Sequence, residues 1–257
     1  MYLTWLDSNS WLIEMGSQRI LLDPWLVGTL SFGIDWLFSG KRSSDRPIPP
    51  DIDLILLSQG LPDHAHPPTL ERLDRSIPVI ASPSAAKVVR SLGYSQVIAL
   101  KPGQSWTLES LSIKAFLGSP IGPFTTENAY LIDDQQHSLY YEPHGYHDRT
   151  LPNSIDVVIT PLIDLNLPLV GSIIQGNRSA FELIERVQPQ VILPTAAGGE
   201  IEFAGLITPV LQAVGSVDNL RSQLVHRSIS TQVIAPTPGD RIEISLTSRT
   251  ANTSSNQ

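Results

Sequence analysis

Apolar positions at the start of the chain come in short runs. Three such runs, at 2–6, 11–15 and 19–22, are separated by the turn-forming segments Asp7-Ser8-Asn9 and Gly16-Ser17. Short apolar runs bounded by turn residues are typical of strands that pair as a meander. We therefore expect three paired strands at the beginning of the fold.

A compact apolar run without alternation, DLILLS, follows at 53–58, and it indicates a strand buried on both faces. Further patterns then follow in the order helix 69–75, strand 78–81, helix from Ser82-Pro83 to Gly93, and strand 97–100. Serine before a first-turn proline favours a helix start. This order of elements predicts a parallel or mixed sheet.

The second half of the chain continues with strand-like and helix-like patterns. We expect strands at 106–108, 111–116, 129–132, 138–141, 157–160, 191–193, 231–234 and 241–246, a helix at about 179–187, and a broken helical stretch over 203–226. No internal repeat and no linker-like segment divides the chain. The sequence thus predicts a single domain over 1–246, followed by a Ser/Thr/Asn-rich, disordered tail at 247–257.

The segment 23–50 lacks periodicity and is rich in Pro, Gly and Ser, yet it carries Trp25, Phe32, Trp36 and Phe38. One interpretation is that these aromatic side chains fold back over the end of the core, since large aromatic residues are usually buried. The other is that the loop 25–38 forms a lid over an apolar substrate, or a patch that meets a membrane or a partner protein.

Composition narrows the classes of function. The chain has 257 residues, no Cys, and a net charge of −8 from 17 Lys+Arg and 25 Asp+Glu. Without thiols there is no disulfide, no Cys-ligated zinc and no Cys nucleophile, so a metal must use His, carboxylate, amide or carbonyl ligands. Because the acidic chain has no Lys/Arg-rich stripe, we expect no binding to nucleic acid.

The sequence also bears on location. The first residues lack the basic and apolar segments of a secretory signal, and the longest apolar stretch, 157–174, is interrupted by Asp164, Asn166 and two prolines. A membrane-spanning helix rarely carries such residues at that density. We therefore expect a cytoplasmic protein that is not an integral membrane protein; a homo-oligomer is compatible with the sequence.

Four of the six His fall in two loops that each follow a predicted strand. The acidic and imidazole side chains concerned are Asp63, His64 and His66 in the first loop and Glu142, His144 and His147 in the second. Folds of alternating strands and helices build their sites at such strand ends, and two of these loops can converge. They could hold a metal; the alternative is that Asp63 caps a turn while the imidazoles contact water or backbone.

The order of elements and three segments, TWL at 4–6, WLIE at 11–14 and RILLDPW at 19–25, resemble the metallo-β-lactamase-fold superfamily. The resemblance runs to about Leu246. It implies an α+β fold, a four-layer αββα sandwich in which two mixed sheets pack face to face with helices outside. It also implies a metal-dependent hydrolase.

The metal motif of that superfamily, His-x-His-x-Asp-His, can be aligned on Asp63-His64. The two earlier His positions then hold Gln59 and Leu61, and leucine cannot bind a metal. The segment 117–123, where the family supplies its next His, contains none. The resemblance therefore implies that the first of the family's two metal sites is absent.

The second site is altered. The family's bridging Asp falls on or near His144, and its closing His falls on Ala196. Asp63, His64 and His144 remain as three ligands with an open position, the pattern of a catalytic site. The implied cofactor is one divalent ion, either zinc, iron or manganese, or no metal at all.

The comparison with the family leaves the roles of several other side chains undecided. His66 is a further candidate ligand, and Asp63, Glu142 and His147 are candidates for the acid–base chemistry. The leading hypothesis is a hydrolase of a small ester-, lactone- or phosphodiester-like substrate. The alternatives are a non-catalytic protein that binds a small, apolar ligand, and an interaction or membrane-surface module that uses the loop 25–38.

Overall fold

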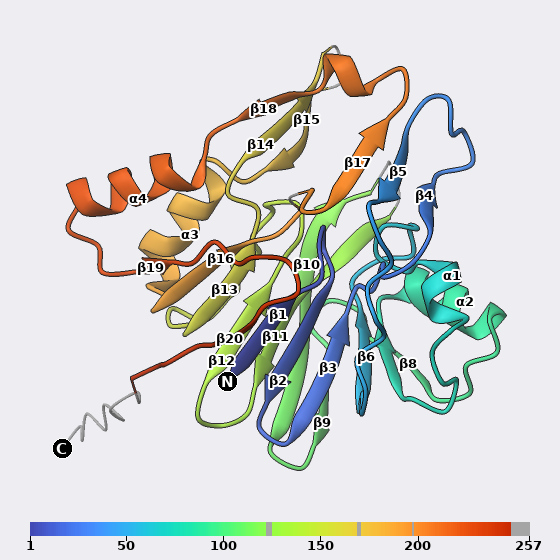
Figure 1. Cartoon of the computed structure of the whole chain (residues 1–257). Coiled ribbons are helices and arrows are strands. Elements are labelled where there is room, and N and C mark those ends of the chain that lie inside the picture. Colours follow the sequence, from blue (N-terminus) through green and yellow to red (C-terminus); the bar gives the residue numbers. More distant parts are fainter. Residues whose placement is uncertain (122–124, 169–170, 197, 248–257) are drawn as a thin grey trace.

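The computed structural model describes residues 1–121, 125–168, 171–196 and 198–247 of the chain (Figure 1). Two mixed sheets, each of seven strands within these ranges, form its centre. The strand orders are β20-β1-β2-β3-β6-β7-β8 and β19-β16-β13-β12-β11-β10-β9.

The first sheet combines the predicted meander with parallel strands. β1, β2 and β3 pair antiparallel, whereas β3, β6, β7 and β8 pair in parallel. The strand bounds are β1 Tyr2–Trp5, β2 Trp11–Met15, β3 Gln18–Leu22, β6 Leu54–Leu57, β7 Val79–Ala81, β8 Val97–Ala99 and β20 Arg241–Glu243. All four residues of β6 are buried, as the unbroken apolar run predicts.

The second sheet is antiparallel from β9 to β12 and parallel from β12 to β19. Its strands are β9 Ser105–Leu108, β10 Leu111–Pro120, β11 Thr126–Asp133, β12 Ser138–Tyr141, β13 Val157–Thr160, β16 Val191–Pro194 and β19 Gln232–Val233. Alternate side chains of both sheets, among them Trp11, Ile13 and Tyr141, form the core between them. The period-two alternation of strands accounts for this division.

Helices cover both outer faces. On the first sheet, α1 (Pro67–Leu70) and α2 (Pro83–Ser91) pack over side chains such as Ile55. On the second, α3 (Ser179–Val187) and α4 (Val217–His226) pack over side chains such as Val158. The layers are therefore helix, sheet, sheet, helix (Figure 1), which confirms the predicted αββα sandwich.

Two smaller sheets, which the sequence did not predict, lie along one edge of the sandwich (Figure 1). Their strands are β4 Thr29–Ser31, β5 Ser39–Arg42 and β17 Ile201–Ala204 in one, and β14 Asp164–Leu167, β15 Gly171–Gln175 and β18 Gln212–Val214 in the other. Part of 23–50 is thus extended, and helix in 203–226 is confined to the short turn Thr208–Val210 and to α4.

Contacts between distant segments explain both differences. β5 pairs with β17 so that Gly40 lies opposite Phe203. A Cβ on Gly40 would come within 2.8 Å of the Trp25 ring and 3.2 Å of Phe203, so only glycine fits there. Such pairing overrides the local helical pattern.

The predicted tail begins at Thr247, whose hydroxyl and N–H both donate to the side-chain oxygen of Gln190 at 2.8 Å. The rest of that prediction, 248–257, lies outside the described residues. Among the residues that the structure describes, no helix is both long and apolar enough to cross a lipid bilayer.

Candidate metal centre

The two histidine-bearing loops converge at the carboxyl ends of β6 and β12, as their positions after strands predict. The ring centroids of His64 and His144 are 5.4 Å apart. One ligand atom from each of Asp63, His64 and His144 lies within 4.8 Å of the others. Three side chains that the sequence placed in one site are therefore neighbours in space.

His64 lies between two carboxylates. Its Nδ1 is 2.7 Å from Asp23 Oδ2, and its Nε2 is 3.1 Å from Asp63 Oδ2. Burial alone lowers the pKa of the imidazole, but the charges of Asp63 and Asp23 outweigh it, so the pKa of His64 lies well above its usual range. Burial conversely raises the pKa of Asp63, yet the contact with His64 holds it below the usual range.

Asp23 anchors this arrangement from the end of β3. The parallel pairing of β3 with β6 sets Leu22 opposite Leu56, so that Asp23 reaches Ser58. Its carboxylate accepts hydrogen bonds from Ser58 N at 2.7 Å, Ser58 Oγ at 2.5 Å and the Tyr141 hydroxyl at 2.7 Å. Asp23 was not among the predicted site residues, although it belongs to the RILLDPW segment.

His144 is oriented by a second carboxylate that the sequence did not single out. Its Nδ1 is 2.9 Å from both oxygens of Glu127, a fully buried residue on β11. Burial, followed by the charge of His64, lowers the pKa of His144. Since Glu127 occupies Nδ1, Nε2 is the nitrogen of His144 left for a ligand.

Glu142, predicted for acid–base chemistry, is buried and fastens the loop that carries His144. Its Oε2 accepts the backbone N–H of His144 at 3.1 Å, that of Tyr146 at 3.0 Å and that of Gly145, and its Oε1 accepts the Ser119 hydroxyl at 3.1 Å. These partners give it a positioning role.

Glu127, Glu142 and His144 form a second group whose ligand atoms lie within 4.8 Å of one another. Burial raises the pKa of Glu127 to about 7. Burial and the neighbouring Glu127 raise the pKa of Glu142 well above its usual range. Gln59, at the family's first His position, donates its Nε2 to Glu127 at 3.1 Å.

The structure does not bring His66 and His147 to this centre. Nδ1 of His66 is 3.0 Å from Thr69 Oγ1, and its Nε2 is 3.1 Å from the carbonyl oxygen of Thr29, so both nitrogens link α1 to β4. Nδ1 of His147 is 3.4 Å from the Tyr140 hydroxyl. Neither imidazole belongs to a group of candidate ligands among the described residues.

His147 should make stability depend on pH. Burial, with help from the charge of Arg186, lowers its pKa from 6.5 to about 3. Between pH 6.5 and 3 the His147 imidazole is therefore protonated in the unfolded chain but neutral in the folded protein. The free energy of unfolding consequently falls as the pH drops toward 3. We expect His147→Gln to lose less stability between pH 6.5 and 5 than the wild type does, measured by urea unfolding. Parallel losses in the two proteins would contradict this assignment.

The centre contains buried acceptors without partners. Asn9 Oδ1, Gln59 Oε1 and Asp63 Oδ1 have no hydrogen-bond partner among the described residues. A buried polar atom requires a donor or a cation. Histidines that bind metals usually donate their other ring N–H to a carboxylate, as His64 and His144 are placed to do. The residues present therefore fit a divalent cation with nitrogen and oxygen ligands.

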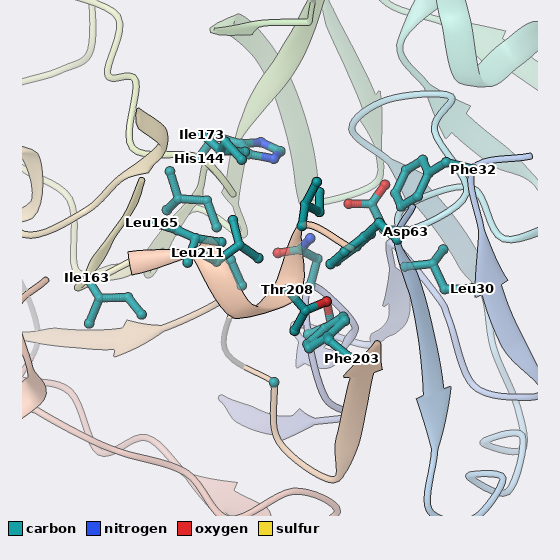
Figure 2. A pocket seen from close by; sticks show the side chains of 17 residues that line it. Leu30, Phe32, Asp63, His144, Ile163, Leu165, Ile173, Phe203, Thr208 and Leu211 are labelled. Carbon is teal, nitrogen blue, oxygen red and sulfur yellow. The ribbon is translucent and has the colours of Figure 1, made fainter. Parts of the chain in front are cut away.

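A cavity of about 520 Å³ opens beside the centre (Figure 2). Asp63, His144 and Asn9 contribute polar groups to its wall. The rest of its lining is mainly apolar and includes Leu30, Phe32, Phe38, Ile163, Leu165, Ile173, Ile174, Phe203, Ile207 and Leu211. These side chains come largely from the two small sheets and their connections.

The aromatic side chains of the segment 23–50 fall into two groups. Some cover the core, and others line the cavity or are exposed, so each of the two interpretations of the sequence applies to part of the segment. Trp25 is fully buried and covers the core. Phe32 and Phe38 line the cavity, and the Phe38 ring stacks on Phe203 at a centroid distance of 5.5 Å. Trp36 is 71% exposed and is the side chain on which the interaction alternative rests.

Comparisons with known proteins agree with this fold. A family described as the beta-lactamase superfamily domain matches residues 2–196, and the chain belongs to that family. The predicted membership is thereby confirmed. A search among curated proteins found no match in sequence.

Three of the matching solved structures share the fold across nearly their whole length. An isothiocyanate hydrolase from Delia radicum gut bacteria is 16% identical, with a TM-score of 0.70 over 95% of this chain and 99% of that one. The metallo hydrolase Igni18 from the archaeon Ignicoccus hospitalis is 14% identical (TM-score 0.64; 94% and 97%). The metallo-beta-lactamase fold protein YhfI from Bacillus subtilis is 17% identical (TM-score 0.63; 94% and 98%).

Proposed function

We propose that the protein is a metal-dependent hydrolase of a small ester-, lactone- or phosphodiester-like molecule, with one divalent cation held by Asp63, His64 and His144. One observation carries this proposal: the three side chains converge beside an apolar cavity that Asp63 and His144 line, with a carboxylate at Nδ1 of each imidazole. Three protein ligands that leave room for substrate are typical of catalytic metal sites.

The chain's own groups have distinct tasks in this proposal. Asp23 and Glu127 fix the ring orientation of His64 and His144. The apolar wall binds the hydrocarbon part of a substrate and excludes water from the reacting bond. A divalent cation supplies Lewis acidity that polarises a carbonyl or phosphoryl oxygen and lowers the pKa of water.

The lining favours uncharged substrates within that range. No Lys or Arg occurs among the described residues that line the cavity. An anionic phosphodiester would therefore meet no side-chain cation, whereas a neutral ester or lactone can bury its apolar part there. The neighbour named as an isothiocyanate hydrolase agrees with a small-molecule substrate for this fold.

Metal analysis of protein purified without chelators or a nickel column tests the proposal. We expect about one divalent ion per chain, lost in His144→Ala. A neutral aryl ester should be hydrolysed, with activity lost on chelation and restored by added cation, and a bis-aryl phosphate should be hydrolysed more slowly.

The matched control is His66→Ala, which removes an imidazole outside the centre and should keep the metal. If His66→Ala folds but contains no metal, His66 is a metal ligand after all. A wild-type protein free of metal, or metal retained in His144→Ala, would contradict the proposal. The metal-free result would favour the non-catalytic ligand-binding alternative.

A further inference from the structure

Asn9 is a buried side chain at the centre with an unused acceptor. It is 3% exposed, it lines the cavity together with Asp63 and His144, and its Oδ1 has no partner in the described part of the chain. Its Nδ2 is 3.2 Å from Nε2 of His64. The amide thus lies beside the nitrogen through which His64 would bind a cation, because Asp23 occupies Nδ1.

The turn that carries Asn9 adopts an unfavourable backbone conformation. Asp7 and Ser8 have φ values of +75° and +48°, in the left-handed region, which is unfavourable for non-glycine residues. Such residues persist where the surrounding structure forces them, and they cluster at functional sites. The turn is therefore more than a connection between β1 and β2.

Buried polar contacts hold this turn in place. The Asp7 carboxylate accepts hydrogen bonds from Arg42, from Arg46 at 2.9 Å and from the Glu200 N–H at 2.9 Å. The Ser8 carbonyl oxygen accepts the N–H of Ala196 at 3.2 Å. Ala196 is the position at which the family resemblance places a closing His ligand. The turn thus lies directly against the place where that ligand is missing.

We propose that Asn9 supplies a fourth protein ligand, through its amide oxygen, to the cation held by Asp63, His64 and His144; this inference rests on the proposed function. The oxygen and nitrogen of an amide exchange places by a half-turn of the side chain, which would bring Oδ1 to the His64 side. The unpartnered oxygen then gains a partner, and the turn replaces the ligand lost at Ala196.

The ligand set has a consequence for the choice of metal. Two imidazoles, a carboxylate and an amide would occupy four coordination positions of the metal ion. A bound substrate then raises the required coordination number to five or six. Manganese and iron accept that number readily, whereas zinc prefers four. The site is therefore better suited to manganese or iron than to zinc.

Titration of chelator-treated protein with Mn²⁺ tests the inference by affinity alone. We expect Asn9→Ala to bind Mn²⁺ at least about 10-fold more weakly than the wild type, because even groups that only hydrogen-bond to metal ligands contribute about 10- to 100-fold to affinity. Asn9→Asp keeps an oxygen at the same place and adds a charge, so it should bind at least as tightly as the wild type. Asn219→Ala, on the exposed side of α4, is the control and should bind as the wild type does.

The outcomes separate this inference from the proposed function. If the wild type binds Mn²⁺ and Asn9→Ala binds equally well or more tightly, Asn9 is no ligand and the three-ligand centre stands. Weak binding by both Asn9→Ala and Asn9→Asp, with unfolding temperatures near that of the wild type, would also overturn it. If the wild type binds no cation at all, both proposals fail.

Discussion

Replacing Asp23 by alanine is expected to lower the free energy of unfolding by about 3–5 kcal/mol, the range for breaking a buried pair of charged groups. The carboxylate is fully buried and receives hydrogen bonds from Ser58, His64 and Tyr141. Alanine would remove the acceptor that these donors share in the core and leave the Ser58 N–H without one. The loss would also free the His64 ring to turn away from the centre.

Thermal unfolding measures the effect of Asp23→Ala, which should lower Tm by roughly 6–20 °C in a domain of this size. Tyr141→Phe removes one of the hydrogen bonds and serves as the matched comparison, with an expected cost of about 1 kcal/mol. Asp23→Asn keeps the shape and should weaken metal binding about 10- to 100-fold. A Tm change in Asp23→Ala no larger than that in Tyr141→Phe would refute the anchoring role.

The second large effect is expected for Arg42. Its guanidinium is buried, forms an ion pair with Asp7, and donates to the carbonyl oxygens of Trp25 at 2.7 Å and Leu6 at 3.3 Å. Removing the guanidinium leaves the buried Asp7 carboxylate without one of the two positive charges that stabilise it. Arg42→Ala should therefore cost about 3–5 kcal/mol, and the loss should extend to metal affinity because Asp7 supports the turn that carries Asn9.

An exposed ion pair provides the control for Arg42. Arg72 pairs with Asp45 at 3.3 Å, and both side chains are at least half exposed. Arg72→Ala should cost about 0–1 kcal/mol, as surface pairs usually do. Urea unfolding of the two variants at the same pH compares them directly. Equal, small losses would show that the buried pair adds little to stability.

The parts of the fold that follow local patterns were predictable. The meander, the fully buried β6 and the start of α2 at Ser82 all appear as expected, the last with Ser82 Oγ accepting the N–H of Ala85 at 3.3 Å. The convergence of the loops that carry His64 and His144 followed from their place after strands. These features depend on neighbours in the sequence.

Other features depend on contacts between distant segments. β5 pairs not only with the nearby β4 but also with β17, more than a hundred residues further along the chain. Glu127 lies just before the strand predicted at 129–132, and only the folded structure brings it against His144. Asn9 likewise reads as a turn residue. Buried polar groups acquire their role from tertiary neighbours, which one sequence does not reveal.

The apolar lining of the cavity and the candidate ligands come from different parts of the fold, which has a consequence for how this protein can change. The candidate ligands stand on loops at the ends of central strands, whereas Leu30, Leu165 and Phe203 line the cavity from the two small peripheral sheets. Substitutions in those sheets can reshape the space offered to a substrate while the ligand-bearing strands stay as they are. The range of substrates and the reaction chemistry can therefore evolve, or be engineered, independently of one another.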